Sequence, residues 1–300
     1  MFNKTLQACF IHDGKAGHLS QLIGLKSAME KLSNLDADVL PYNTVKKQKK
    51  DPANPYQLII SAGSKSQKLG LRLAHQHQAV SVSLMKPRWR LNQFDFIITP
   101  KHDKLKPAEN ILLTEGALSS VKTPEQQDAN IIKDKHLILL GGPSKHYAWE
   151  CQTLIEQIKA LADHNTHQPW QLFSSRRTPQ YTLEKLQALA LPNLSVFTPQ
   201  HANRQVYHAA LETAKNCWVS PDSVSLLYEA LTAGAQVGLL SLAQKRKKLA
   251  ASHQSLCEAG HVTMFTTWQV STELAPNTLA LDESLRSAQW LLNHLRQNTN

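Results

Sequence analysis

The chain has 300 residues, of which 42% are hydrophobic and 19% are charged. That length is more than one hydrophobic core usually organises, and it is sufficient for two α/β domains. No run of 18 apolar residues occurs, and the N-terminus lacks the apolar core of a signal peptide. We therefore expect a cytoplasmic protein without a membrane-spanning segment.

The charge balance is basic, with 33 Lys and Arg against 23 Asp and Glu and a formal net charge of +10. The basic residues gather in four runs, at 46–50, 86–90, 101–106 and 245–248. Such runs suit nucleic acid, an anionic membrane surface or phosphorylated sugars, although a charge run can also be a plain solvated face. No nucleic-acid motif accompanies them, and only 6% of the residues are aromatic. We expect no nucleic-acid partner, since no base-stacking platform is evident.

Hydrophobic patterning predicts strands that alternate with helices. In the first half it predicts strands at 6–11, 36–40, 57–61, 79–83, 94–98 and 111–114, and helices at 20–32 and 65–76. In the second half it predicts strands at 136–140, 169–173, 194–197, 216–219, 236–240 and 262–264, and helices at 147–163, 181–190, 203–213, 223–233, 246–258 and 282–297. This alternation is typical of an α/β protein with two Rossmann-like, doubly wound domains that face a cleft.

The polar stretch 121–130 separates the two halves. It contains Pro124 and lacks hydrophobic periodicity, so it predicts a linker. We place an N-terminal domain at 1–125 and a C-terminal domain at 126–280. The helix within 281–300 is expected to pack back on the N-terminal domain.

The first predicted strand is followed by His12-Asp13-Gly14-Lys15-Ala16-Gly17-His18 and then by an amphipathic helix. Two glycines here permit a tight turn close to a ligand. The pattern is neither the dinucleotide fingerprint nor a Walker A loop, because the glycines stand as Gly-x-x-Gly and no Gly-Lys-Ser/Thr follows. It favours a backbone-lined loop for an anion or a substrate, with a histidine and an aspartate attached.

The segment 217–234 predicts a buried strand, a polar turn and a helix closed by Gly234. Asp222 or Ser223 is expected to cap this helix, so that its N–H groups and positive dipole end face a diphosphate. Glu229 lies seven positions after Asp222, about 10 Å further along the same helix face, where a carboxylate could accept hydrogen bonds from a ribose. The alternative is that Glu229 is a solvated helix residue.

Other polar turns also follow predicted strands, which is where open α/β sheets bind ligands. In the second half these turns hold Gly141, Gly142, Ser144, Arg176 and Arg177. The two guanidinium groups suit phosphate oxygens. In the first half the turns hold Gly63, Arg88 and His102.

Several of these residues belong to motifs that occur in order along nearly the whole chain. The motifs are Asp13-Gly-Lys-Ala-Gly17-His18-x-x-Gln21-x-x-Gly24-Leu25, Lys86-Pro87-Arg88, Phe94-Asp95, Pro100-x-His102-Asp103, Thr114-x-Gly116-Ala117-Leu118, Gly141-Gly142-Pro-Ser144, Ser175-Arg176-Arg177-Thr178-Pro179 and Asp222-Ser223-x-Ser225-x-x-x-Glu229-Ala. With them the chain resembles the Elm-type mitochondrial-fission family and its bacterial relatives, which are regarded as GT-B glycosyltransferases. It departs from the family pattern at 201–207, where Asn-Pro-Tyr is expected, and at Pro221, where threonine is expected.

The resemblance implies a GT-B fold, a nucleotide-sugar donor in the C-terminal domain and a saccharide or glycolipid acceptor in the N-terminal one. For bacterial members it also implies work on surface glycans such as lipooligosaccharide, within lipopolysaccharide biosynthesis. The residues expected at the donor are Gly141, Gly142, Ser144, Arg176, Arg177, Asp222, Ser223, Ser225 and Glu229. The residues expected at the acceptor are Gly14, Lys15, Gly17, Gly63, Arg88 and His102.

Glycosyl transfer needs a base for the acceptor hydroxyl and cationic or N–H groups for the departing nucleoside diphosphate. His18 is the preferred base, because a free histidine titrates near neutral pH, and Asp13 either orients it or is itself the base. The alternative is that His18 only caps or packs the first helix. Arg176 and Arg177 would neutralise the diphosphate together with the helix that begins at Ser223.

We expect no metal and no cofactor besides the nucleotide sugar as co-substrate. The only Asp-x-Asp, at 36–38, enters a strand of the first half and is badly placed to hold a metal on the donor. Cys9, Cys151, Cys217 and Cys257 are far apart and imply neither a disulfide nor a zinc site. Two of them stand in apolar strand contexts, which is typical of buried thiols.

Two other classes of function stay open. One is an interaction or scaffold protein of GT-B shape that has lost its chemistry, and the other is a nucleotide-sugar epimerase of the same fold. For a transferase with a lipid-linked acceptor, we expect peripheral binding to the inner face of the cytoplasmic membrane. The run Lys46–Lys50 is the preferred contact, ahead of Lys245–Lys248 in the donor domain.

Overall fold

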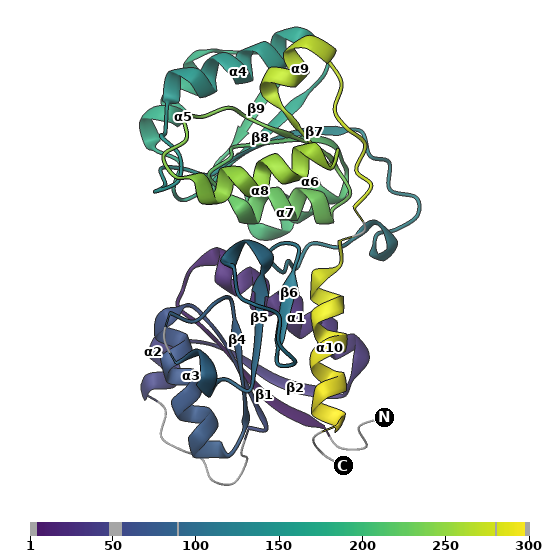
Figure 1. Ribbon diagram of the computed structural model, residues 1–300. Helices are drawn as coiled ribbons and strands as arrows, with labels where there is room; N and C mark the ends of the chain where they lie inside the picture. The colour runs from purple at the N-terminus through teal and green to yellow at the C-terminus, as the bar shows by residue number, and fades with distance from the viewer. Residues whose placement is uncertain (1–4, 48–55, 89, 280, 298–300) are drawn as a thin grey trace. The chain divides into compact units, whose positions relative to one another are not determined.

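The computed structural model describes residues 5–47, 56–88, 90–279 and 281–297. Its contacts divide the chain into two compact units. Unit 1 comprises Met1–Ser120 together with Asp282–Asn300, and unit 2 comprises Val121–Leu281. Each unit is built on a six-stranded sheet whose neighbouring strands are all parallel (Figure 1). The predicted fold class, α/β with two doubly wound sheets, is confirmed.

Unit 1 has the strand order β2-β1-β3-β4-β5-β6. Its strands are β1 (Leu6–His12), β2 (Leu35–Pro41), β3 (Leu58–Ala62), β4 (Val80–Leu84), β5 (Phe96–Pro100) and β6 (Ile111–Thr114). Its helices are α1 (Ala16–Leu32), α2 (Tyr42–Lys47), α3 (Ser64–His77) and α10 (Glu283–Gln297), with 3-10 turns η1 (Leu91–Gln93) and η2 (Lys101–Asp103).

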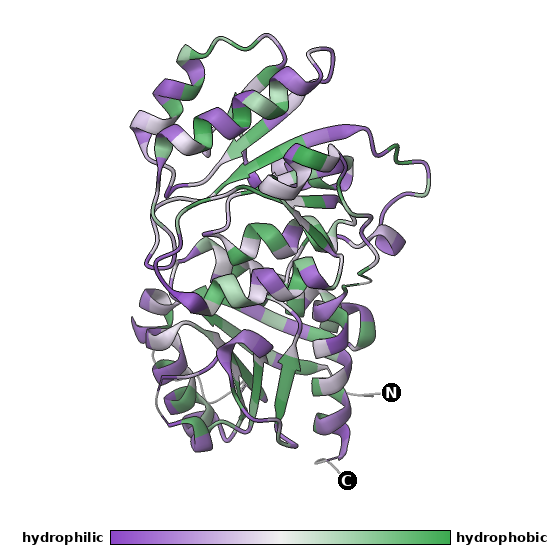
Figure 2. Ribbon diagram, turned by 45° about the horizontal axis from the view of Figure 1, so that its top comes forward, coloured by the Kyte–Doolittle hydropathy of each residue, from purple (hydrophilic) through white to green (hydrophobic). Residues whose placement is uncertain are grey.

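Successive residues of the unit 1 strands point to opposite faces of the sheet and so form two apolar layers. Ala8 and Phe10 of β1 pack in the layer of α1 and α10. Cys9 and Ile11 pack in the layer of α2 and α3. Figure 2 shows hydrophobic colouring along the strands and mixed colouring around the helices, as expected when each helix buries one stripe.

Helix α10 closes unit 1 although it comes from the far end of the chain. Its residues Ala288, Leu291, Leu292 and Leu295 belong to the same apolar core as α1. The Ser284 hydroxyl donates to the carbonyl of Ser119 at 2.7 Å, and Arg286 donates to the carbonyl of Leu113 at 2.7 Å. Both contacts lie within unit 1.

Unit 2 has the strand order β12-β11-β10-β7-β8-β9. Its strands are β7 (Lys135–Leu140), β8 (Trp170–Ser174), β9 (Leu194–Phe197), β10 (Ala214–Val219), β11 (Gln236–Leu239) and β12 (Val262–Met264). Its helices are α4 (Cys151–His164), α5 (Gln180–Ala188), α6 (Arg204–Glu212), α7 (Val224–Thr232), α8 (Lys247–Glu258) and α9 (Phe265–Ser271), with a 3-10 turn η3 (Pro124–Gln126).

The same alternation organises unit 2. Leu137 and Leu139 of β7 pack in the layer that contains α6 and α7, whereas Ile138 and Leu140 pack in the layer that contains α4, α5 and α9. Cys217 of β10 is fully buried, as is Cys9 of β1, which confirms both as core thiols. Burial, supported by the charge of Asp38, raises the pKa of Cys9 to about 12.

The predicted linker is docked on unit 2. Val121 is only 5% exposed and belongs to the apolar core of that unit. The side-chain amide of Gln127 donates to the carbonyl of Ala233 at 3.2 Å. The division between the units therefore falls between Ser120 and Val121 rather than after residue 125.

The predicted helices and strands all exist, with ends shifted by a few residues. The largest differences at a helix start are at α1 and α4, because the first begins at Ala16 and the second at Cys151. The sequence prediction missed the short helices α2 and α9. No helix among the described residues is long and apolar enough to cross a bilayer.

Candidate functional site

Each sheet has one point where the strand order reverses, and ligands of open α/β sheets bind outside the carboxyl ends of the strands there. In unit 1 this point lies between β1 and β3, because β2 stands on one side of β1 and β3 on the other. In unit 2 it lies between β7 and β10. Most of the predicted donor residues and part of the predicted acceptor residues follow these four strands.

Asp13 and His18 form the polar pair at the reversal point of unit 1. Asp13 follows β1, His18 stands in the first turn of α1, and His18 Nδ1 lies 2.7 Å from Asp13 Oδ1. An ionised carboxylate can only accept, so Nδ1 carries the hydrogen, and in the neutral form of the imidazole Nε2 has the free lone pair. Both side chains are partly exposed, at 18% for His18 and 13% for Asp13. His18 does not cap α1, because Lys15 is the N-cap residue and the His18 imidazole is held by Asp13.

Gly63 makes room for this pair from the neighbouring strand. It follows β3 with φ of +94°, a backbone conformation that favours glycine. A Cβ atom there would lie 2.4 Å from Asp13 Oδ2 and 2.9 Å from His18 Nδ1. The predicted acceptor residue Gly63 thus has a structural reason to be glycine that does not depend on any ligand.

Burial disfavours the Asp13 carboxylate, but the His18 charge and hydrogen bond, with help from Lys15, outweigh burial and lower the Asp13 pKa. The Lys15 ammonium lies 3.6 Å from Asp13 Oδ2, and the Lys15 backbone N–H donates to Asp13 Oδ1 at 3.2 Å. Asp13 therefore stays ionised and suits the orienting role better than that of a base. Gly14 has φ of +89°, and Gly17 lies in the first turn of α1.

The other two predicted acceptor residues follow different strands. Arg88 is exposed in the segment after β4. His102 lies on η2 after β5. In the sheet order β1-β3-β4-β5, both positions are displaced from the β1–β3 reversal point toward the β6 edge.

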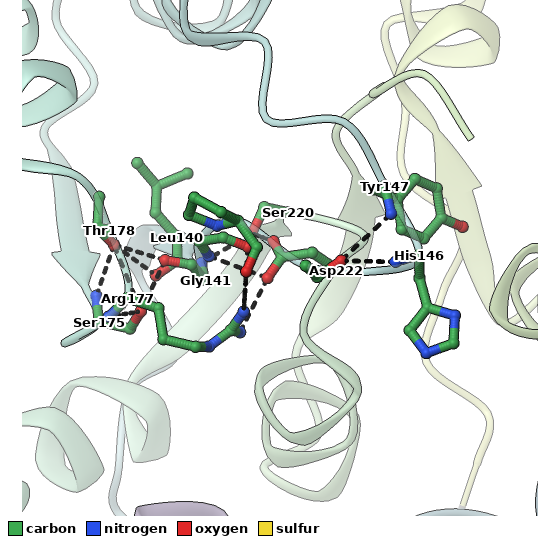
Figure 3. A network of polar contacts seen from close by, with 12 residues as sticks. Leu140, Gly141, His146, Tyr147, Ser175, Arg177, Thr178, Ser220 and Asp222 are labelled. Carbon is green, nitrogen blue, oxygen red and sulfur yellow. Dashed lines mark hydrogen bonds and ion pairs between the residues drawn. The ribbon is translucent and has the colours of Figure 1, made fainter. Parts of the chain in front are cut away.

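Asp222 is the centre of the polar network at the reversal point of unit 2 (Figure 3). Its carboxylate accepts from the Gly142 N–H at 2.9 Å and from the Ser220 hydroxyl at 2.7 Å. The Arg177 guanidinium approaches the same carboxylate at 2.8 Å. The Asp222 side chain is 1% exposed, whereas that of Arg177 is 46% exposed. Burial raises the pKa of Asp222, although the Gly142 N–H and Arg177 act against it.

Gly141 and Gly142 are close-approach positions rather than open ligand loops. A Cβ atom on Gly141 would lie 2.3 Å from Asp222 Oδ2, and one on Gly142 would lie 2.1 Å from the Arg177 carbonyl oxygen. Both backbone N–H groups already have partners, because that of Gly141 donates to Ser220 Oγ at 2.8 Å and that of Gly142 donates to the Asp222 carboxylate. The glycines therefore let two neighbouring turns approach β7.

The turn after β8 is tied to β7 by side-chain hydroxyls. Ser175 and Thr178 both donate to the Gly141 carbonyl at 2.6 Å, and Arg177 donates to the Gly142 carbonyl at 3.0 Å. Arg176 is exposed in the same turn. The predicted guanidinium pair is thus divided, with Arg177 anchored to Asp222 and Arg176 pointing to solvent.

The predicted side-chain cap of α7 is wrong. Ser223 occupies the N-cap position, but its side chain makes no cap hydrogen bond. The Asp222 carboxylate is committed to the Gly142 N–H, Ser220 and Arg177 instead. The first N–H groups of an α-helix have no partner within the helix, and α7 has no acidic side chain in its first turn. Ser225 is half-buried in that turn.

Glu229 is 8% exposed, so the alternative of a solvated helix residue is wrong. The Tyr207 hydroxyl of α6 donates to Glu229 Oε2 at 2.8 Å. Burial, followed by the charge of Glu229 and this hydrogen bond, raises the pKa of Tyr207, so the phenol remains a donor. Tyr207 also meets Phe173 edge to face, with ring centroids 5.6 Å apart.

Sequence reasoning missed several partners that organise this site. Ser220, Tyr207, Ser175 and Thr178 were absent from the predicted donor set, although the last two stand in the Ser-Arg-Arg-Thr-Pro motif. The Ser144 hydroxyl accepts from the N–H groups of His146 and Tyr147 at 3.1 and 3.2 Å. Within the described part of the chain, no group of three or more His, Cys, Asp or Glu could hold a metal ion.

Solved structures share this architecture. MnaA of S. aureus, solved with UDP, matches with a TM-score of 0.63 and 14% identity over 98% of this chain and 97% of that chain. UDP-GlcNAc 2-epimerase from Neisseria meningitidis, bound to UDP-GlcNAc, matches at 0.59 and 11% over 97% and 100%. MurG of Acinetobacter baumannii matches at 0.54 and 12% over 97% and 99%. The protein is therefore of the GT-B-like α/β class.

The family is shown by sequence. The model of the mitochondrial fission ELM1 family matches residues 16–295, so the chain belongs to that family, as the motifs predicted. Mitochondrial fission protein ELM1 of Arabidopsis thaliana is 25% identical over 282 residues, which cover 80% of this chain. The chain spans 64% of the length of that relative.

Proposed function

We propose that the protein is a metal-independent glycosyltransferase that moves a sugar from a nucleotide sugar to a hydroxyl of a saccharide or glycolipid, in the assembly of surface glycans. The observation that carries the proposal is the Asp13–His18 pair. A 2.7 Å hydrogen bond to a carboxylate fixes the imidazole and leaves Nε2 as the acceptor of a proton. The pair stands where an open α/β sheet binds its ligand.

In the proposed reaction, His18 Nε2 takes the proton of the acceptor hydroxyl. The acceptor oxygen then bonds to the anomeric carbon of the donor. The bond from that carbon to the diphosphate breaks, and its electron pair leaves with the nucleoside diphosphate. An oriented base of this kind contributes about 10²–10⁴-fold in rate.

Unit 2 supplies the donor site in this proposal. The N–H groups at the start of α7 suit a diphosphate, and the half-exposed Arg177 guanidinium can meet its oxygens beside them. The Glu229 carboxylate, which is held by the Tyr207 hydroxyl, accepts hydrogen bonds from the ribose hydroxyls. Gly141 and Gly142 act indirectly by letting Asp222 and Arg177 into position.

The first test is a screen of nucleotide sugars for thermal stabilisation, since a ligand that binds only the native state raises stability as RT ln(1 + [L]/Kd). Glu229→Gln should weaken the hit by about 10- to 150-fold in a calorimetric titration, because one hydrogen bond to a charged group contributes about 1.5–3 kcal/mol. Glu184→Gln, an exposed carboxylate of the same unit, is the matched control. No stabilisation by any nucleotide sugar would favour the scaffold alternative.

The second test separates base from scaffold. His18→Ala should lower transfer by about 10²–10⁴-fold with donor affinity unchanged, whereas His167→Ala, at an exposed histidine, should leave it unchanged. If His18→Ala stays active while Asp13→Asn abolishes transfer, the base is Asp13. Full activity of both variants would reduce the loop to a structural role.

A nucleotide-sugar epimerase is the second candidate, because several of the solved structures with this fold, including the Neisseria meningitidis protein, are UDP-GlcNAc 2-epimerases. The two reactions differ in their need for a second substrate. An epimerase converts the nucleotide sugar with no acceptor present, whereas a transferase does not. Proton NMR of the nucleotide sugar incubated with the protein alone distinguishes them.

A further inference from the structure

A groove of about 1730 Å³ in unit 1 is lined largely by residues of α3 and includes Asp13 of the site described above. Its lining includes Asp13, residues of α3 from Ser64 to Gln76, and Gln78 just after that helix. Ligand pockets for small molecules usually measure about 300–1,000 Å³, so this groove has room for more than one sugar unit.

The groove is lined by cations from several segments. Helix α3 contributes Lys65, Lys68, Arg72 and His75. Their spacing of three, four and three residues places them along one stripe of the helix. Lys15, Lys46, Arg88 and Arg90 add cations from the segments around α3. The helix itself carries no Asp or Glu.

The lining has two acidic residues, and one of them pairs with a cation of the groove. Asp13 is held by His18 and Lys15. Asp95 accepts from the N–H and the hydroxyl of Ser81, both at 2.7 Å. Among the residues that the structure describes, Lys65, Arg72 and Arg88 form no ion pair with a carboxylate. A concave surface of one charge sign raises the local concentration of oppositely charged ligands.

We propose that this groove binds the acceptor, and that the acceptor is a saccharide carrying at least two phosphate or carboxylate groups. Arg72 stands seven positions after Lys65, about 10 Å along the helix, so the stripe suits two anionic groups at about that separation. Because Asp13 lines the groove, a saccharide lying there can bring a hydroxyl to the Asp13–His18 pair. The role as acceptor rests on the proposed transferase activity, but the anion binding can be measured without it.

An anionic membrane surface is the competing partner for a basic patch. A flat bilayer meets a flat or convex face, whereas these cations line a concavity whose lining also includes Asp13. Lys46, of the run predicted to contact the membrane, lines the groove, and Lys47 is exposed on α2. Lys49 and Lys50 lie outside the described residues. The geometry therefore favours a saccharide over a lipid surface.

The test is a titration with a defined soluble probe, a β-1,6-linked glucosamine disaccharide with a phosphate at each end. The unphosphorylated disaccharide is the uncharged control. Lys65→Gln/Arg72→Gln should weaken binding of the bisphosphate at least tenfold, with circular dichroism and thermal melting unchanged because both residues are exposed. Lys31→Gln/Lys106→Gln removes the same charge from exposed sites of unit 1 outside the groove and should leave the affinity within about twofold.

Three outcomes would overturn the proposal. The first is equal binding by both double variants, which would mean nonspecific attraction to a basic protein. The second is no binding of the bisphosphate while a nucleotide sugar still binds, which would reject the anionic acceptor and leave the proposed function standing. The third is no binding of the bisphosphate but salt-sensitive sedimentation with vesicles of equal parts phosphatidylglycerol and phosphatidylcholine, which would assign the cations to a membrane surface.

Discussion

Asp222 offers the sharpest test of how unit 2 is organised. Asp222→Ala removes the acceptor of the Gly142 N–H and of the Ser220 hydroxyl, and both donors are buried. A buried donor without a partner costs about 1–3 kcal/mol. The Arg177 pair adds little, because that guanidinium is 46% exposed and can be rehydrated. We expect Asp222→Ala to lower the free energy of unfolding of unit 2 by about 2–4 kcal/mol.

Asp222→Asn separates shape from charge. An amide oxygen can still accept from the Gly142 N–H, so the loss should be about 1–2 kcal/mol smaller than for the alanine variant. Asp163→Ala, an exposed carboxylate on α4 paired with Lys159, is the matched control and should cost less than about 0.5 kcal/mol. Urea unfolding followed by tryptophan fluorescence and circular dichroism gives the comparison. If Asp222→Ala costs no more than the control, the network does not stabilise the unit.

Three further predictions concern other contacts. Gly63→Ala should displace Asp13 and His18 and so lower the transfer rate by more than tenfold, while donor affinity in unit 2 stays constant. Transfer kinetics measure the first effect and calorimetry the second, and an unchanged transfer rate would contradict the prediction. Tyr207→Phe should cost about 1 kcal/mol of stability and weaken nucleotide binding about three- to tenfold, so unchanged titrations would detach Tyr207 from donor binding. Burial and the charges of Arg204 and Lys122 lower the pKa of His208 to about 4, so the unfolded state binds more protons below about pH 6.5. The stability from a neutral His208 is then complete above that pH and is lost as the pH falls toward 4. When the pH is lowered from 7 to 4.5, the free energy of unfolding measured in urea should fall by about 1–2 kcal/mol less for His208→Gln than for the wild type.

The elements that could be predicted are those whose signals are local. Strands such as β1, β3 and β7 contain buried apolar runs, because helices cover both faces of the sheet there, and the strand ends were placed within two residues. Helix α2 was missed because six residues are too short for a periodic pattern, and Tyr42-Asn-Thr-Val contains no strong helix former. Helix α9 has the same difficulty, with seven residues that include two threonines and a valine.

The candidate site divides along the same line. Asp13 and His18 are five residues apart, on the loop after β1 and in the first turn of α1, so their contact could be expected from the sequence. The partners of Asp222 could not, because Gly142 stands 80 residues away and meets it only through the pairing of β7 with β10. The cap prediction failed for this reason. The buried Asp222 carboxylate is already bound by the Gly142 N–H, the Ser220 hydroxyl and the Arg177 guanidinium, so it is not available to cap α7.

The two reversal points therefore differ in what they leave for a ligand. In unit 1 the glycines and the carboxylate hold one imidazole, and its Nε2 remains for chemistry. In unit 2 the Gly141 and Gly142 N–H groups, which a glycine-rich turn would ordinarily offer to phosphate, are consumed by Ser220 and Asp222. We infer that any diphosphate in unit 2 must be met by the start of α7 and by the exposed face of Arg177. A variant that removes the ion pair between Arg177 and Asp222 should then weaken nucleotide binding, because the Arg177 guanidinium is no longer held in position. We expect this loss even though the variant leaves a guanidinium unpaired beside the site.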